Sequence, residues 1–170
     1  MKAAHVVIGI VMFILFWAYQ AGYAASLGPA AWFVAALVFS VLLMAMGKTS
    51  MEKPQPDIKS AWQFSIAFVL ISTLIISFAG QSLGAVVPAD PSAWTPMLLS
   101  FWLVVFGGAM LVTGWKIDSP LTTLVGIIWL FSALHFVTAV GTGANSYLHF
   151  GLVTGLTTIL AGLFGKAPKA

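Results

Sequence analysis

The 170-residue sequence contains no cysteine and no arginine. Without cysteine, the chain cannot form disulfides, iron–sulfur clusters or thiolate metal sites. Its formal net charge of +3 therefore comes from seven lysines set against four acidic residues. Arginine is the side chain that most often reads phosphates and nucleic acids. The basic character thus gives no indication of nucleic-acid binding, and no nucleic-acid partner is predicted.

Charged residues are also scarce, at 6% of the chain, whereas hydrophobic residues make up 61%. A soluble domain uses about a quarter charged residues to cover its surface. The mean hydropathy of +1.05 agrees with a chain that is not covered by water. We therefore predict an all-α integral membrane protein with the lipid bilayer as its first partner.

Six segments contain the roughly 20 predominantly apolar residues that a membrane span needs. The first resembles a signal peptide, but we interpret it as a retained membrane helix. Prolines open three spans and none lies in mid-span, so continuous helices are expected; they are Pro29, Pro96 and Pro120. The predicted spans, which together form a single six-helix domain over residues 1–170, are about 4–25, 29–47, 60–83, 94–115, 120–141 and 146–165.

The lysines predict the orientation of these spans. All of them fall on one side, whereas the loops on the other side contain only Asp90 as a charged residue; they are Lys2, Lys48, Lys53, Lys59, Lys116, Lys166 and Lys169. Lysine-rich loops stay in the cytoplasm, so both termini are predicted to be cytoplasmic. The spans then pair in sequence as three helical hairpins, each of which ends on the lysine side with Gly-Lys or Gly-Trp-Lys.

The tripeptide Leu-His-Phe occurs twice, at 134–136 and at 148–150, on either side of a short Gly/Asn turn. Counting residues from this turn places His135 and His149 at similar depth on antiparallel helices. They could be haem ligands, or polar residues that line a path or pack between helices. No Asp, Glu or Cys is embedded nearby as a third ligand, so no metal site and no cofactor are predicted.

The spans contain no embedded charge, although cation transporters and proton pumps normally carry carboxylates there. Uncharged polar side chains such as Gln63 and Ser65 suit a path for a small neutral or singly anionic solute. A stripe of small residues on the last span favours close helix packing; it comprises Gly151, Gly155, Thr158 and Gly162. No nucleophile–base pair and no phosphate-binding loop is apparent, so an enzyme is not predicted.

Several segments resemble the acetate uptake transporter family of six-helix microbial permeases. They are Ala-Gly-Tyr at 21–23, FSIAFVLISTLIISF at 64–78, FWLVVFGGAMLVTGWK at 101–116 and the stretch 129–166. The resemblance implies a location in the prokaryotic cytoplasmic membrane, assembly as a hexamer and a path with an apolar narrowing. It also implies that Ile10, Phe64, Ser65 and Phe131 line the gate. The family's opening motif is absent from residues 1–10, where only Gly9 corresponds.

The leading hypothesis is therefore a permease or channel for small monocarboxylates such as acetate, with Gln63 and His135 as further residues of its path. An alternative is a non-transporting accessory subunit of a larger membrane complex, since the opening motif is missing. A third is a haem-binding membrane subunit that uses His135 and His149. The first hypothesis predicts a homo-oligomer, and the second predicts a hetero-complex.

Overall fold

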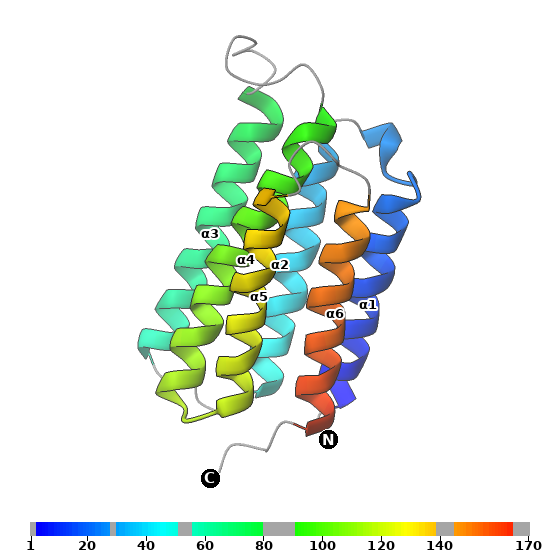
Figure 1. Ribbon diagram of the computed structural model, residues 1–170. Coiled ribbons are helices and arrows are strands. Elements are labelled where there is room, and N and C mark those ends of the chain that lie inside the picture. Colours follow the sequence, from blue (N-terminus) through cyan, green and yellow to red (C-terminus); the bar gives the residue numbers. More distant parts are fainter. Residues whose placement is uncertain (1–2, 28–29, 51–55, 80–90, 139–144, 165–170) are drawn as a thin grey trace.

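The computed structural model describes residues 3–27, 30–50, 56–79, 91–138 and 145–164, and these residues are all-helical with no strand (Figure 1). A short 3₁₀ turn, η1, covers Ala25–Leu27. The predicted set of six helices is confirmed; they are α1 (Ala3–Gln20), α2 (Ala30–Ser50), α3 (Pro56–Ala79), α4 (Pro91–Lys116), α5 (Pro120–Thr138) and α6 (Ser146–Phe164).

Four of these helices, α1, α3, α4 and α6, are long and apolar enough to cross a membrane. The other two contain shorter apolar runs, Ala30–Met46 in α2 and Pro120–His135 in α5. The chain is therefore a helical, membrane-embedded protein, as predicted. The first helix ends at Gln20, before the expected end of its span, and the third begins at Pro56, before the expected start. The expected ends of the third and fifth spans lie outside the described residues.

Two of the prolines that the sequence places at span starts lie in described helices, with different outcomes. Pro120 is the first residue of α5, as expected. Pro96 lies inside α4, because that helix already begins at Pro91. The first position of a helix tolerates proline, because a backbone N–H at that position would have no partner within the helix. Pro91 takes this position, and Pro96 removes one backbone donor further along. Pro29 lies outside the described residues.

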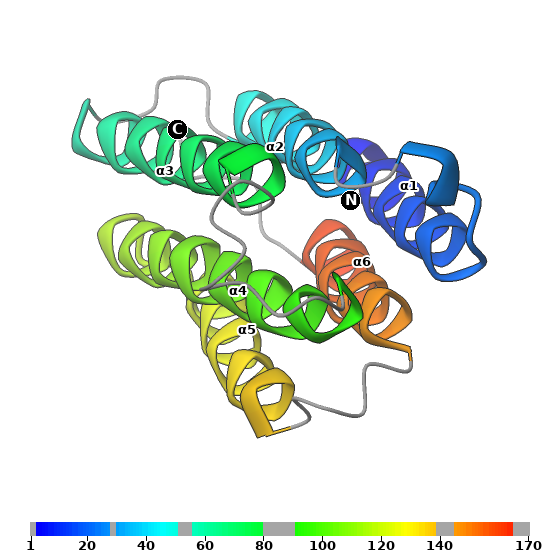
Figure 2. The ribbon, with the colours of Figure 1, turned by 90° about the horizontal axis from the view of Figure 1, so that it is seen from above.

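The helices form two layers with one helix outside them (Figure 2). In the view from above, α1, α2 and α3 lie in one row, α4 and α6 lie in a second row, and α5 covers the outer side of α4. The beginning of α1 and the end of α6 lie at the same end of the bundle (Figure 1). Lys59, in the first turn of α3, and Lys116, at the end of α4, also lie at this end.

The closest helix pairs are α1 with α6 and α4 with α5, rather than the three expected hairpins. Glycines permit both approaches. A Cβ atom on Gly9 would lie 2.6 Å from the carbonyl oxygen of Gly155, and one on Gly155 would lie 2.7 Å from that of Gly9. At the α4–α5 contact, a Cβ atom on Gly126 would lie 2.8 Å from the carbonyl oxygen of Gly107. The small stripe on the last span is thus a packing surface, as predicted, but the three-hairpin arrangement is not confirmed.

Candidate functional site

Six buried aromatic rings close the space between the two layers; we call them the aromatic cluster, and they are Phe16, Phe39, Trp102, Phe106, Trp129 and Phe150. Phe39 in α2 is the centre of the cluster. Its ring centroid lies 5.2–6.4 Å from those of the other five rings, which belong to α1, α4, α5 and α6. The middle of the bundle is therefore apolar, and side chains rather than backbone fill it.

Hydrogen bonds to threonines on neighbouring helices hold the tryptophan indoles in place. Trp102 donates its Nε1–H to Thr73 of α3 at 3.1 Å, and Trp129 donates to Thr157 of α6 at 2.8 Å. These bonds satisfy the indole N–H groups, which would otherwise be costly in an apolar interior. Sequence reasoning missed both pairs. The available signal was the position of the two tryptophans in mid-span, away from the membrane surfaces where tryptophan usually lies.

Two buried serine hydroxyls remain available for other polar groups. The Oγ atoms of Ser40 in α2 and Ser77 in α3 have no hydrogen-bond partner among the described residues. Other buried hydroxyls are bonded, as when Ser100 of α4 donates to the carbonyl oxygen of Ala133 in α5 at 2.9 Å. Ser40 and Ser77 are at most 1% exposed, so these two oxygens lie inside the bundle and away from its surface.

The residues expected to form a gate do not meet inside the bundle. Ile10, Phe64 and Phe131 are 45%, 71% and 68% exposed, and their helices α1, α3 and α5 do not pack closely against one another. Gln63 is also exposed, whereas Ser65 is buried. An apolar side chain is as stable against lipid as in a protein core, so the residue type did not predict whether these side chains face inward or outward. Within one protomer Ile10, Phe64 and Phe131 therefore face outward, and their lining of a gate stays a prediction. A role for them between protomers stays a prediction.

The two histidines, which the sequence places at similar depth on antiparallel helices, lie next to each other. His135 lies in the last turn of α5 and His149 in the first turn of α6, with ring centroids 4.9 Å apart and planes tilted by 33°. Gln20 at the end of α1 accepts a hydrogen bond from the backbone N–H of Leu148 at 3.4 Å, which ties a third helix to this corner. His135 is exposed and His149 is partly buried.

This arrangement of the histidines does not accommodate a haem between them. In a bis-histidine haem, each imidazole nitrogen lies about 2 Å from the iron on opposite faces of the porphyrin, so the ring centroids are more than about 6 Å apart. The 4.9 Å separation places the two rings in direct contact instead. Among the described residues, no group of three or more His, Cys, Asp or Glu side chains could hold a metal ion.

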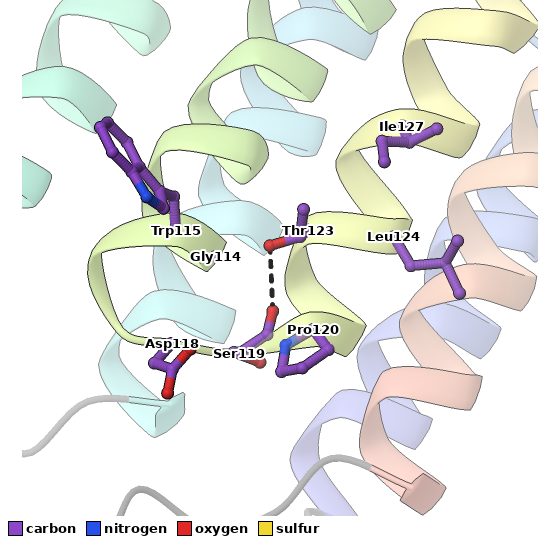
Figure 3. A pocket seen from close by; sticks show the side chains of 8 residues that line it. All are labelled: Gly114, Trp115, Asp118, Ser119, Pro120, Thr123, Leu124 and Ile127. Atoms are coloured by element: carbon purple, nitrogen blue, oxygen red, sulfur yellow. Dashed lines mark hydrogen bonds between the residues drawn. The ribbon is translucent and has the colours of Figure 1, made fainter.

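A separate pocket of about 490 Å³ lies on the outer face of the α4–α5 hairpin, at the end of the bundle that carries Lys59 and Lys116 (Figure 3). The turn is well defined: Asp118 adopts a left-handed φ of 50°, and Thr123 donates to the carbonyl oxygen of Ser119 at 3.1 Å. No residue of the aromatic cluster lines the pocket; its lining comprises Gly114, Trp115, Asp118, Ser119, Pro120, Thr123, Leu124 and Ile127.

Comparisons of the chain with protein-family models, with curated proteins and with solved structures give no match. The relation to acetate transporters therefore stays a resemblance.

Proposed function

We propose that this protein is a protomer of a permease or channel for small monocarboxylates such as acetate, with its path closed by the aromatic cluster. The observation that carries the proposal is the central position of Phe39. Its ring contacts rings from four other helices across the space between the two layers. Apolar constrictions gate membrane pores by excluding water until the side chains move.

The surroundings of the cluster suit a small solute of low charge. Among the side chains whose burial the structure describes, no Asp, Glu, Lys or Arg is buried, so none of these would trap an anion. The hydroxyls of Ser40 and Ser77 could bond a carboxyl group during its passage. Uncharged hydroxyl groups solvate a solute without holding it tightly.

Uptake of labelled acetate into proteoliposomes at acidic and neutral pH tests the proposal. We expect flux above that of empty vesicles, and a severalfold increase with Phe39→Leu, which shortens the central side chain while keeping it apolar. Phe39→Ala should increase the flux further, if the variant remains folded after a loss of about 3–5 kcal/mol in stability.

Phe64→Leu is the matched control, since Phe64 is 71% exposed and stacks only on Phe68 among the described aromatic rings. It should leave the flux unchanged. Absence of flux from the unmodified protein and from both Phe39 variants would overturn the proposal. An effect of Phe64 or Phe131 substitution without an effect at Phe39 would move the gate to a contact between protomers.

A second candidate is a non-transporting subunit of a larger membrane complex. The absence of the transporter family's opening motif from residues 1–10 favours it, and an unlike subunit could cover the exposed helix faces that carry Ile10, Phe64 and Phe131. Purification in a mild detergent distinguishes the candidates. A transport protomer should purify as a homo-oligomer, with the hexamer as the expected form, whereas an accessory subunit should bring unlike chains with it.

A further inference from the structure

His135 and His149 carry imidazoles, a side-chain type that can bind metal ions, and neither belongs to the aromatic cluster that closes the proposed path. They come from different helices, and their ring centroids are 4.9 Å apart. The pair is held in register by the packing of α5 against α6. It is held also by the bond from Leu148 to Gln20, next to His149. Two helices thus present two imidazoles to one point at the end of the bundle.

The spacing suits two ligands on the same side of one metal ion. A divalent transition metal binds imidazole nitrogen at about 2.0–2.1 Å, so two adjacent ligands have nitrogens about 3 Å apart. Rings whose centroids are 4.9 Å apart reach this separation by small rotations about their side-chain bonds. This same-side arrangement differs from the opposed one that a haem requires.

The surroundings admit a hydrated cation. Both histidines lie within one turn of a helix end, and His135 is exposed, so water can fill the remaining coordination positions. The helix α5, with 19 residues, is about 28 Å long and separates the pair from Lys116. Because the Coulomb energy falls with separation, repulsion of the cation by the lysine is weak at that distance.

We propose that His135 and His149 form a two-imidazole site for a divalent transition-metal ion, which fastens α5 to α6 at the end of the bundle remote from Lys59 and Lys116. Nitrogen ligands exclude Mg²⁺ and Ca²⁺, which require oxygen. Among the divalent first-row metals, Cu²⁺ binds such ligands most strongly. The remaining positions are open to water.

Electron paramagnetic resonance of the full chain in detergent, with copper(II) chloride as the probe, tests the site. The protein is purified through a tag that contains no histidine. We expect one Cu²⁺ per chain and a nitrogen splitting pattern from two imidazoles. In titration calorimetry, His135→Ala and His149→Ala should each lower the affinity by at least the roughly 10–100-fold that loss of an outer-shell partner costs.

His5→Gln is the control, because His5 lies in the first turn of α1 at the opposite end of the bundle. It should leave the affinity and the spectrum unchanged. A spectrum with splitting from one nitrogen or from none in the unmodified protein would overturn the proposal. Copper binding by the His135→Ala, His149→Ala double variant that equals binding by the unmodified protein would also overturn it, because it would show an adventitious ion only. The spectrum is recorded on the unmodified protein, so the test remains valid even when a variant fails to fold. It is also independent of acetate flux, so the site and the transport function can fail separately.

Discussion

At the residue scale, single hydrogen bonds between tryptophan and threonine side chains join neighbouring helices. Trp62 of α3 donates to Thr113 of α4 at 2.9 Å, in addition to the Trp102–Thr73 and Trp129–Thr157 pairs. Thr113 and Thr157 also donate their own hydroxyls to carbonyl oxygens within their helices. Each of these two hydroxyls is thus both donor and acceptor, so neither the threonine hydroxyl nor the indole N–H bonded to it is left without a partner.

The Trp129–Thr157 bond should contribute measurably to stability. Trp129→Phe and Thr157→Val each remove one partner from a fully or nearly buried position. Because the substitutions also change packing, a double-mutant cycle is needed to isolate the bond. We expect a coupling energy of about 0.6–1 kcal/mol, as found for hydrogen bonds between membrane helices.

Unfolding of the four proteins in detergent, followed by circular dichroism, measures this coupling. Trp115→Phe serves as the control, since Trp115 is 81% exposed and its loss should leave stability nearly unchanged. Strictly additive effects at positions 129 and 157 would contradict the role given to the bond.

At the scale of helices, two close contacts organise the bundle, and the contact between α1 and α6 joins the two ends of the chain. Gly9 and Gly155 face each other so closely that a Cβ atom on either would overlap the other's carbonyl oxygen. On α6, Gly151 extends the contact, since its Cβ would lie 2.8 Å from the Cβ of Phe16. Because the obstructing atoms include backbone, a side chain here must separate the helices.

Gly155→Val should therefore destabilise the protein by about 1–3 kcal/mol, the usual cost of overpacking. Gly108→Ala is a control of opposite sign, because nothing lies within 4 Å of its Cβ position. Alanine is a better helix former than glycine by about 1 kcal/mol, so Gly108→Ala should leave stability unchanged or raise it. Thermal unfolding of both variants in detergent measures the difference. Equal effects of the two substitutions would contradict the close α1–α6 contact.

At the scale of the whole molecule, the bundle has two different ends. Lys59 and Lys116 lie at one end, where Lys116 forms an ion pair with Asp57 at 3.4 Å. The His135–His149 pair lies at the other end. The end of α1 also lies there, and the backbone N–H of Tyr23 donates to the carbonyl oxygen of Ala18 in its last turn at 3.1 Å. In a bilayer, the lysine end should face the cytoplasm.

The absence of native cysteine makes this orientation directly testable with single-cysteine variants. Tyr23→Cys replaces a side chain that is 75% exposed, and Ser60→Cys replaces an exposed one near Lys59. A membrane-impermeant maleimide should label the first variant in intact cells and the second only after the membrane is opened. The reverse pattern would place the lysine end outside.

Much of the local structure was determined by the amino-acid sequence alone. Long apolar runs and the near absence of charge require helices that satisfy their own backbone hydrogen bonds in lipid. The helix positions and the common depth of His135 and His149 follow from this requirement and from the rise per residue of a helix.

Only the tertiary structure decided which apolar side chains face inward. Phe39 and Phe64 are the same residue type in two apolar helices, yet Phe39 is fully buried and Phe64 is 71% exposed. In water, the solvent would impose a difference between the two faces of a helix, whereas lipid is as apolar as the core. The sequence therefore carried little information about the aromatic cluster, about the pairing of α1 with α6, and about which residues could form a gate.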